Sequence, residues 1–485
     1  MSELALLPAA ELRRRILRRE LSPVEVTEAC LAQVERHNEE INAVVTLNDR
    51  ALEEARALEK RLAGGEDPGP LSGLPVGIKD VTETAGIRTT YGSPLYADFV
   101  PDEDALVVRR FREAGAVILG KTNTPEFAAG GNTFNEVFGR TRNPWDPERS
   151  AGGSTGGGAA GLVTGMIALA QGTDLGGSLR IPASFCGVVG LRPSPGLVPT
   201  YPARYLWDDL QVTGTMARTA EDVALSLAAV AGPSPLSPLA QPTAGRDFVA
   251  VVRRGPPERP YLAFCPDIAG IGIDPEMDRV CRESLESLAA AGAEVEEIEL
   301  DLSYGRDAFL ELRGLWFVAQ MYDELDRIDA FGPNVSANLR SGLAVTTREL
   351  GAAEAARHRM REEFRDLFDR FDHLLTPCMA VPPFPVEENY PAAIGGREME
   401  TYVDWIAPTF VLSLTGLPVG SVPCGLDSAG LPVGLQIVGP PMGEESVLAL
   451  AGHVQALRPL GHPAIVGSRA ADRPRTVNPS READR

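Results

Sequence analysis

Features that mark metalloproteins and secreted proteins are scarce in this sequence. The six cysteines are scattered over 485 residues, and neither they nor the five histidines show the spacing of metal ligands. The first residues, MSELALLPAAELRRR, carry their charges after the short apolar stretch, which is the reverse of a secretion signal. We therefore expect a cytoplasmic protein with reduced thiols, without a metal and without an organic cofactor.

Hydrophobic runs that could cross a membrane are also lacking. Two uncharged stretches have the necessary length, residues 151–173 and 405–426. The first contains eight glycines, and the second is interrupted by Pro408, Pro418 and Pro423. Neither composition suits a helix that faces lipid. Both stretches are expected in a buried core, where backbone packs closely on backbone.

Basic charge is in deficit. The chain has 46 Lys and Arg against 67 Asp and Glu, which gives a formal net charge of −21. Phosphate backbones and anionic lipid repel such a chain. Nucleic acid and membrane surfaces are therefore not expected as partners, and a monomer or a homodimer is the default expectation.

Lysine is the rarest charged residue, since only Lys60, Lys79 and Lys121 occur. A lysine retained in an arginine-rich chain is a candidate for a task that arginine cannot perform, because arginine does not lose its proton in proteins. Lys60 lies in a charged helical segment and needs no such role. Lys79 follows the apolar segment GLPVGI, which would desolvate the ammonium and lower its pKa. A neutral lysine can serve as a general base.

Two serines directly follow Gly-Gly pairs, Ser154 in AGGSTGGG and Ser178 in GTDLGGSLRIP. Glycine lets the backbone approach a substrate closely and lets N–H groups converge. A tetrahedral oxyanion needs at least two such donors, and the N–H groups of Leu175, Gly176, Gly177 and Ser178 are candidates. No histidine lies between residues 79 and 192, and a GxSxG elbow is missing. The base for a reactive serine is therefore better sought in lysine.

Helices that alternate with short apolar strands predict an α/β sheet with helices on both faces. Ser22-Pro23-Val24-Glu25 has the pattern of a helix start, with a Ser cap, Pro in the first turn and Glu at the capping-box position. Further helices are expected over 103–115, 219–230, 274–292 and 357–375, and strands over 116–119 and 294–300.

Five segments together resemble the amidase signature family. They are GLPVGIKD (73–80), GKTNTPEFAAGGNTFNEVFG (120–139), AGGSTGGGAAG (151–161), GTDLGGSLRIPASFCGVVGLRPSPG (172–196) and TGLPVGSVPCGLDSAGLPVGLQIVG (415–439). The resemblance covers roughly residues 60–460, with the motifs in the family's order. It implies a central mixed, twisted sheet flanked by helices on both faces. We expect a helical arm over residues 1–60, a catalytic domain over 61–466 and a disordered tail over 467–485.

The resemblance also implies roles for individual residues. Ser178 would be the nucleophile, and Ser154 would pass its proton to Lys79, the general base. The peptide bond between Gly153 and Ser154 would be cis. Asp174 and Arg180 would hold the Gly-Gly turn, and Thr155 stands where the family usually has a second serine. Lys121 and Cys186 are interpreted as structural residues.

The substrate is expected to be a small-molecule or oligomeric amide, with an apolar or aryl amide favoured over glutamine and with carbamates and esters also compatible. Aromatic residues concentrate where the family builds its substrate pocket, although core packing explains part of this pattern equally well. The candidate pocket residues are Gly130, Gly131, Asn132, Tyr201, Tyr205, Trp207, Trp316 and Cys378, with Phe317, Met321 and Tyr322 nearby in the sequence.

Three alternative functions are compatible with parts of the sequence. The glutamine-hydrolysing subunit of a tRNA-dependent amidotransferase shares the signature, but residues 405–409 read WIAPT, where those subunits carry an Asp that would hold the glutamine amine, and residues 346–356 lack their basic glycine-rich motif. A dinucleotide-binding oxidoreductase is suggested by GGGAAG (156–161), but no strand is expected before it and the next acidic residue, Asp174, is too close. A member of the family that only binds is disfavoured because all three catalytic residues are present.

Overall fold

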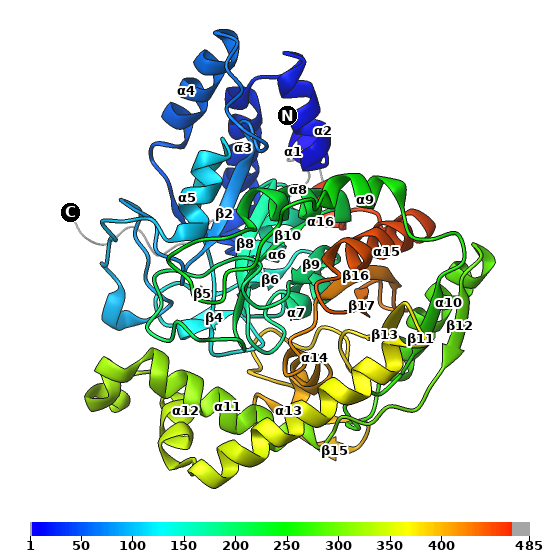
Figure 1. Ribbon diagram of the computed structural model, residues 1–485. Helices are drawn as coiled ribbons and strands as arrows, with labels where there is room; N and C mark the ends of the chain where they lie inside the picture. The colour runs from blue at the N-terminus through cyan, green and yellow to red at the C-terminus, as the bar shows by residue number, and fades with distance from the viewer. Residues whose placement is uncertain (1, 468–485) are drawn as a thin grey trace.

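An eleven-stranded mixed β-sheet forms the centre of the protein (Figure 1), in a computed structural model that describes residues 2–467. Strand β2 pairs in parallel with β3 and β8, β11 pairs in parallel with β12 and β13, and the other neighbours are antiparallel. In spatial order the strands are β1 (Val44–Leu47), β3 (Val117–Thr122), β2 (Pro75–Lys79), β8 (Leu169–Asp174), β10 (Val212–Ala217), β9 (Val189–Arg192), β16 (Val419–Leu426), β17 (Pro432–Val438), β13 (His373–Pro377), β11 (Tyr261–Phe264) and β12 (Glu294–Glu297).

Both faces of this sheet are buried, each under its own set of helices. Neighbouring residues on β3 show the division, since Ile118 belongs to the hydrophobic cluster that contains residues of α5 (Leu106–Glu113), α8 (Ala220–Val230) and α15 (Glu444–Leu457), whereas Leu119 belongs to the cluster that contains residues of α3 (Pro23–Ile41) and α6 (Gly156–Val163). Successive residues of a strand point to opposite faces. The expected α/β fold, with helices on both faces of a mixed sheet, is therefore confirmed.

Three helices form a separate group below the sheet in the view of Figure 1: α11 (Gly305–Gln320), α12 (Pro333–Ala344) and α13 (Thr347–Phe368). Helix α11 packs against both of the others and against α14 (Ala407–Ser413). The remaining helices are α1 (Ser2–Ala5), α2 (Ala9–Leu17), α4 (Ala51–Ala63), α7 (Arg180–Cys186), α9 (Phe248–Arg254), α10 (Pro275–Ala290) and α16 (Ala464–Gly467). Short hairpins pair β4 (Phe134–Asn135) with β5 (Gly139–Arg140), β6 (Arg142–Asn143) with β7 (Asp146–Ser150) and β14 (Ala393–Ile394) with β15 (Arg397–Glu398).

Several helices begin at the residues expected from the sequence. Ser22 caps α3 in a capping box with Glu25, and Thr219 and Asp274 cap α8 and α10. The helix expected over 357–375 is wrong at both ends. A second capping box, between Thr346 and Glu349, starts α13 earlier, and the run HLLTP leaves the helix pattern because it pairs as β13 with β11 and β17.

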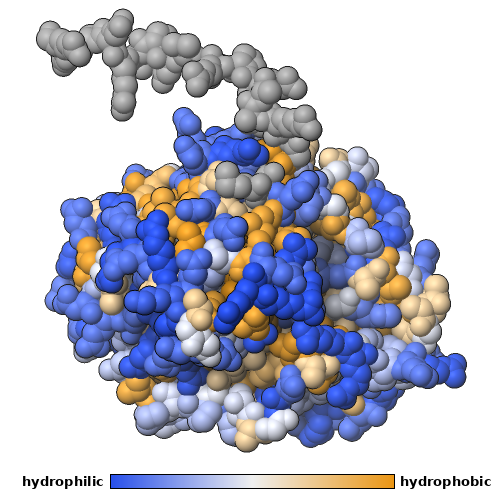
Figure 2. Space-filling model, turned by 90° about the horizontal axis from the view of Figure 1, so that it is seen from above, coloured by the Kyte–Doolittle hydropathy of each residue, from blue (hydrophilic) through white to orange (hydrophobic). Residues whose placement is uncertain are grey.

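The N-terminal segment is more than the expected helical arm, because β1 within it forms one edge of the main sheet. The expected disordered tail, 467–485, lies outside the described residues except for Gly467. Among residues 2–467, no helix has both the length and the apolar character needed to span a membrane. Seen from the side of the N-terminal helices, the surface is mainly hydrophilic, with smaller hydrophobic areas between (Figure 2).

Candidate active site

The ends of two neighbouring strands bring the buried lysine and its partners together. Strands β2 and β8 run in parallel, so their carboxyl ends, Lys79 and Asp174, lie at the same edge of the sheet. Lys79 is fully buried, and its Nζ lies 2.6 Å from Ser154 Oγ and 3.0 Å from Thr173 Oγ1. The structure thus joins Lys79 to Ser154 across 75 residues of sequence.

Ser154 lies in the loop between β7 and α6, and the peptide bond from Gly153 to Ser154 is cis. A tight backbone contact backs this loop, because a Cβ atom on Gly153 would lie 2.9 Å from Gly130 O and 2.9 Å from Gly131 C. A side chain at position 153 would therefore push this loop away from the segment containing Gly130 and Gly131. The strand β7 before the glycines belongs to a two-stranded hairpin, which corrects the expectation that no strand precedes them.

Ser178 lies in the next loop, directly after β8 and before α7. The Thr155 N–H donates to the Ser178 carbonyl oxygen (3.2 Å), which ties the loop of Ser154 to the loop of Ser178. Ser178 is partly exposed, whereas Ser154 and Lys79 have no exposed surface. The arrangement therefore ties the loop of a partly exposed serine to the loop of a buried serine that contacts a buried amine.

The backbone before Ser178 offers free hydrogen-bond donors. Within residues 2–467, the N–H groups of Leu175, Gly176 and Ser178 have no acceptor. The N–H of Gly177 differs, because it donates to Asp174 Oδ1 at 2.8 Å. Gly177 has a φ of +121°, and a Cβ there would lie 2.3 Å from Thr409 Oγ1. Gly177 therefore shapes the turn, and the expectation that it supplies an oxyanion donor is corrected.

A fully buried ion cluster fixes this turn. Arg180 donates to both carboxylate oxygens of Asp174 at 3.0 Å, and Leu179 N–H donates to Asp174 Oδ2 at 3.2 Å. Arg192 Nη1 lies 3.4 Å from Asp174 Oδ1. Burial alone would raise the pKa of Asp174, but Arg180 and then Arg192 hold it well below its usual value. Asp174 and Arg180 lie together as expected, and Arg192 is an addition that the sequence did not predict.

Burial gives Lys79 the properties of a base. It lowers the pKa of Lys79 to about 7 from 10.5, although the negative charge of Asp174 opposes the shift. Near neutral pH a large fraction of Lys79 is therefore uncharged and can accept a proton through Ser154. No His, Cys, Asp or Glu group within residues 2–467 is arranged to hold a metal ion.

Lys121 is the other buried lysine, and its hydrogen bonds stabilise the loop that follows β2. Its Nζ is held by the carbonyl oxygen of Thr82 and by the hydroxyls of Thr84 (3.2 Å) and Thr89 (2.8 Å). Burial lowers its pKa to about 8, and Asp80 and Glu83 oppose that shift. Lys121 thereby holds the loop after β2, which contributes Thr82 and Glu83 to a cavity.

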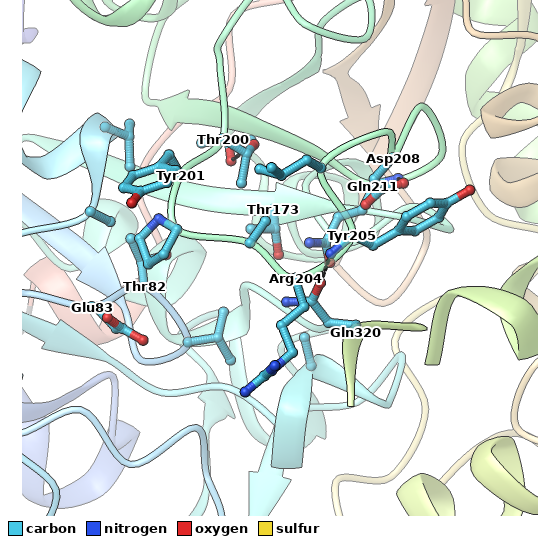
Figure 3. A pocket seen from close by; sticks show the side chains of 18 of the residues that line it. Thr82, Glu83, Thr173, Thr200, Tyr201, Arg204, Tyr205, Asp208, Gln211 and Gln320 are labelled. Carbon is cyan, nitrogen blue, oxygen red and sulfur yellow. Dashed lines mark hydrogen bonds between the residues drawn. The ribbon is translucent and has the colours of Figure 1, made fainter. Parts of the chain in front are cut away.

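This cavity, of about 610 Å³, adjoins the buried lysine through Thr173, which lies in its wall and lies 3.0 Å from Lys79 Nζ (Figure 3). Figure 3 shows Thr173 in the middle, with Glu83 on one side and Asp208, Gln211 and Tyr205 on the other. Aromatic rings make up much of the wall. They are Tyr91, Tyr96, Phe99, Phe127, Tyr201, Tyr205 and Trp316.

Only some of the expected pocket residues line this cavity. Tyr201, Tyr205, Trp316 and Met321 do. Trp207 and Tyr322 are instead 68% exposed, and Phe317 lies in the core. The segment 316–322 thus supplies a residue of the cavity wall (Trp316), a residue of the core (Phe317) and a residue of the surface (Tyr322).

The other pocket candidates contact segments next to the catalytic loops. Cys378 is fully buried, and its thiol donates to the Arg180 carbonyl oxygen at 3.4 Å. Asn132 donates to the carbonyl oxygens of Val386 (3.1 Å) and Glu388 (2.7 Å) and accepts from Ser150 Oγ. Gly130 and Gly131 pack on Gly153. None of these residues lines the 610 Å³ cavity, so their assignment to the substrate pocket stays a prediction.

Comparison with protein families gives one match along most of the chain, because the family model described as Amidase matches residues 25–448. The chain belongs to the amidase signature family. Its members act as hydrolases on carbon–nitrogen bonds, and this chain is a member by sequence as well as by fold.

Relatives within the amidase signature family bear two kinds of name. An acylamidase of Rhodococcus erythropolis is 34% identical over 464 residues, which covers 93% of this chain and 96% of that protein. A glutamyl-tRNA(Gln) amidotransferase subunit of Moorella thermoacetica is 36% identical over 451 residues, covering 87% and 91%.

Solved structures of the family resemble this chain along almost its whole length. A bacterial aryl acylamidase superposes with a TM-score of 0.88 at 27% identity, covering 96% of this chain and 99% of that chain. A glutamyl-tRNA(Gln) amidotransferase subunit of Thermotoga maritima superposes with a TM-score of 0.73 at 27% identity, covering 95% and 98%.

Three residues of the site were not predicted from the sequence. Thr173 contacts Lys79, Arg192 joins the ion cluster, and Asp208 lies in the cavity wall. A signal existed for two of them. Thr173 lies within the GTDLGGS motif, and Arg192 ends a buried apolar strand, where an arginine needs a partner. No comparable signal marked Asp208.

Proposed function

We propose that this protein hydrolyses amide bonds of small apolar or aryl substrates through an acyl-enzyme on Ser178. Ser178 Oγ attacks the carbonyl carbon while its proton passes through Ser154 to the neutral Lys79. The tetrahedral oxyanion accepts hydrogen bonds from free N–H groups among Leu175, Gly176 and Ser178. The contact that carries this proposal is the 2.6 Å separation between Lys79 Nζ and Ser154 Oγ, which supports the second part of the proposed proton path, from Ser154 to Lys79.

The second half of the reaction reverses the proton path. As the tetrahedral species collapses, Lys79 returns the proton through Ser154 to the leaving nitrogen, and the amine departs. Water then attacks the ester on Ser178 and loses its proton along the same path, which releases the acid and restores the free serine. Since the acyl-enzyme route makes no demand on the leaving atom, esters and carbamates should also react.

The cavity wall supports an apolar or aryl substrate. Its rings offer apolar contact and edge or face packing to an aromatic group. The likeness to the aryl acylamidase structure, with a TM-score of 0.88, agrees with this choice. The wall has carboxylates but only one arginine, Arg204, whose guanidinium pairs with Asp323. Neither feature suits the carboxylate of free glutamine.

A glutamine-hydrolysing subunit is the second candidate, because amidotransferase relatives are 33–36% identical to this chain. The segment 405–409 argues against it, since it forms part of the buried core and carries no acidic side chain. The carboxylate next to this segment, Asp404, is occupied by Arg306 (2.7 Å) and lines a separate pocket of about 200 Å³.

A substrate panel tests the proposal. The wild type and Ser178→Ala are assayed with a nitroanilide, an apolar aryl amide, a carbamate, a p-nitrophenyl ester and glutamine. We expect the wild type alone to hydrolyse the first four. Hydrolysis of glutamine only, or activity that requires an added protein partner, would favour the amidotransferase alternative instead. Turnover by Ser178→Ala equal to the wild type would refute the assigned nucleophile.

A further inference from the structure

Asp208 is a carboxylate in the cavity wall that accepts hydrogen bonds and has no basic partner in the part of the chain that the structure describes. It lies in the loop between β9 and β10. Its Oδ1 accepts from the N–H groups of Leu210 and Gln211, both at 2.9 Å, and its Oδ2 accepts from Trp316 Nε1 at 2.6 Å. No basic side chain within residues 2–467 forms an ion pair with it.

The arginines nearby are committed to other acceptors. Arg192 is close enough to interact electrostatically with Asp208, but its guanidinium donates to the carbonyl oxygens of Asp174, Leu210 and Ser413 and pairs with the Asp174 carboxylate. Arg357, on α13, pairs with Asp209 (2.8 Å) and with Glu354 (3.1 Å). Arg204 pairs with Asp323.

The rest of the cavity wall adds negative charge. Glu83 accepts from the Tyr91 hydroxyl (2.6 Å), and Glu324 accepts from the Tyr96 hydroxyl (2.9 Å). Glu324 also pairs with Arg327, and Glu83 interacts with the buried Lys121. Glu83 and Asp208 thus both accept hydrogen bonds only from neutral donors, and Asp208 differs in that two backbone N–H groups and Trp316 hold it in the wall.

The negative charge of Asp208 is therefore not neutralised by an ion pair with any residue in the range 2–467. Burial raises its pKa to about 6, although its three hydrogen bonds oppose the shift. The group therefore remains ionised at the pH where Lys79 is neutral. A carboxylate oxygen has two lone pairs, so Oδ2 can accept a second donor beside Trp316. The rings of Trp316 and Tyr205 line the same cavity and can attract a cation through their faces.

We propose that Asp208 selects substrates that carry a protonated amine, so that the favoured substrate is an aryl or apolar amide with an ammonium group away from the scissile carbonyl. This inference rests on the amide hydrolysis proposed above and adds its substrate class. The ammonium would donate to Asp208 Oδ2, while the aromatic part packs on the rings of the wall. Charge-assisted hydrogen bonds of this kind are among the stronger polar contacts in proteins.

Two pairs of nearly isosteric substrates test the inference at about pH 8. One pair carries the charge on the acyl side, the anilides of 4-(aminomethyl)benzoic acid and 4-ethylbenzoic acid. The other carries it on the leaving group, acetanilides with the same two substituents. In at least one pair, we expect wild-type kcat/KM to favour the ammonium member by about tenfold or more.

The variants separate recognition from folding. Asp208→Asn should lower kcat/KM for the ammonium member about tenfold more than for its ethyl counterpart, since any disturbance of the wall by the new amide affects both members alike. Asp209→Asn is the matched control, because it removes the adjacent carboxylate, which pairs with Arg357 and lies outside the cavity wall. That variant should keep the wild-type preference.

Two results would overturn the inference: equal wild-type kcat/KM within both pairs, or an equal loss for both members in Asp208→Asn. If the wild type hydrolyses none of the four amides, the proposed function fails, and calorimetric binding decides the role of Asp208 separately. Tighter binding of 4-(aminomethyl)benzamide than of 4-ethylbenzamide, lost in Asp208→Asn, would support the inference. Equal binding would refute it.

Discussion

Replacing Lys79 with methionine should abolish activity. It should also remove the pH-dependent free energy that the folded protein loses by burying an ionisable lysine. The native pKa of about 7, against 10.5 for an ordinary lysine, means that the unfolded chain binds more protons between those values. Wild-type stability therefore rises with pH across this window. At 1.36 kcal/mol per pKa unit, the full shift corresponds to about 5 kcal/mol, all of it present as a penalty below about pH 7.

The penalty should disappear in the variant, because methionine has a similar length and no charge. Lost contacts to Ser154 and Thr173 offset part of the gain, by about 1 kcal/mol each. The loss of these contacts varies little with pH. A pH-dependent change in the difference in unfolding free energy between variant and wild type therefore reports the titration of Lys79. We expect the advantage of Lys79→Met to shrink by about 2 kcal/mol between about pH 7 and about pH 9.

Urea unfolding of both proteins at the two pH values measures this difference. Lys60→Met is the matched control, because it removes an exposed lysine on α4 and should show no such change. A difference between Lys79→Met and wild type that stays constant with pH would mean that Lys79 is not held neutral in the native state. The assignment of Lys79 as the general base would then fail.

Three further outcomes follow from the site. The kcat/KM of the wild type for an amide should rise with pH around a midpoint of about 7, as Lys79 loses its proton, and a flat pH profile would contradict this. Arg180→Ala should cost about 3–5 kcal/mol in urea unfolding, because it leaves the buried carboxylate of Asp174 with one arginine fewer, and a loss below about 1 kcal/mol would argue against the ion cluster. Gly177→Ala should greatly lower kcat, because its φ of +121° and the 2.3 Å approach to Thr409 force the turn to move, and unchanged kcat would show that the turn tolerates a side chain.

The structure brings Lys79 and Ser154 together as predicted, whereas it agrees with only part of the predicted cavity wall. Lys79, Ser154 and Ser178 stand in short motifs whose local composition reveals them: a lysine after an apolar strand and two serines after Gly-Gly pairs. Since β2 and β8 end at the same edge of the sheet, Lys79 and the loop of Ser178 lie at that edge, and the loop after β7 adds Ser154. These three residues could be picked out because a few adjacent residues are enough to define each motif.

The cavity wall depends on segments that meet only in the folded protein. Trp207 and Trp316 looked equivalent in the sequence, but Trp207 lies on the surface and Trp316 is held by its hydrogen bond to Asp208. Asp208 itself gave no signal, because its proposed role depends on its place in the cavity wall and on the lack of an ion-pair partner among residues 2–467, and neither can be seen in the sequence. Cys378 was expected in the pocket wall, but its buried thiol donates to the carbonyl oxygen of Arg180, and the sequence does not reveal this contact.

Tertiary pairing also explains the error in the helix expected over 357–375. The helical periodicity continues past Phe368, but residues 373–377 complete the sheet between β17 and β11. The start of α13 was available in principle, because Thr346 and Glu349 have the capping-box spacing. The start was therefore missed although its local signal is present, whereas the end depends on a strand pairing that the local sequence does not reveal.

The central claim is that Ser178 carries the acyl group, and trapping that group tests it most directly. The protein is mixed with an activated aryl ester that deacylates slowly, quenched in acid and analysed by mass spectrometry of the intact chain and its peptides. We predict one acyl group per chain, located on Ser178, and none in Ser178→Ala. Turnover without an adduct on Ser178, or an adduct that persists in Ser178→Ala, would contradict the account.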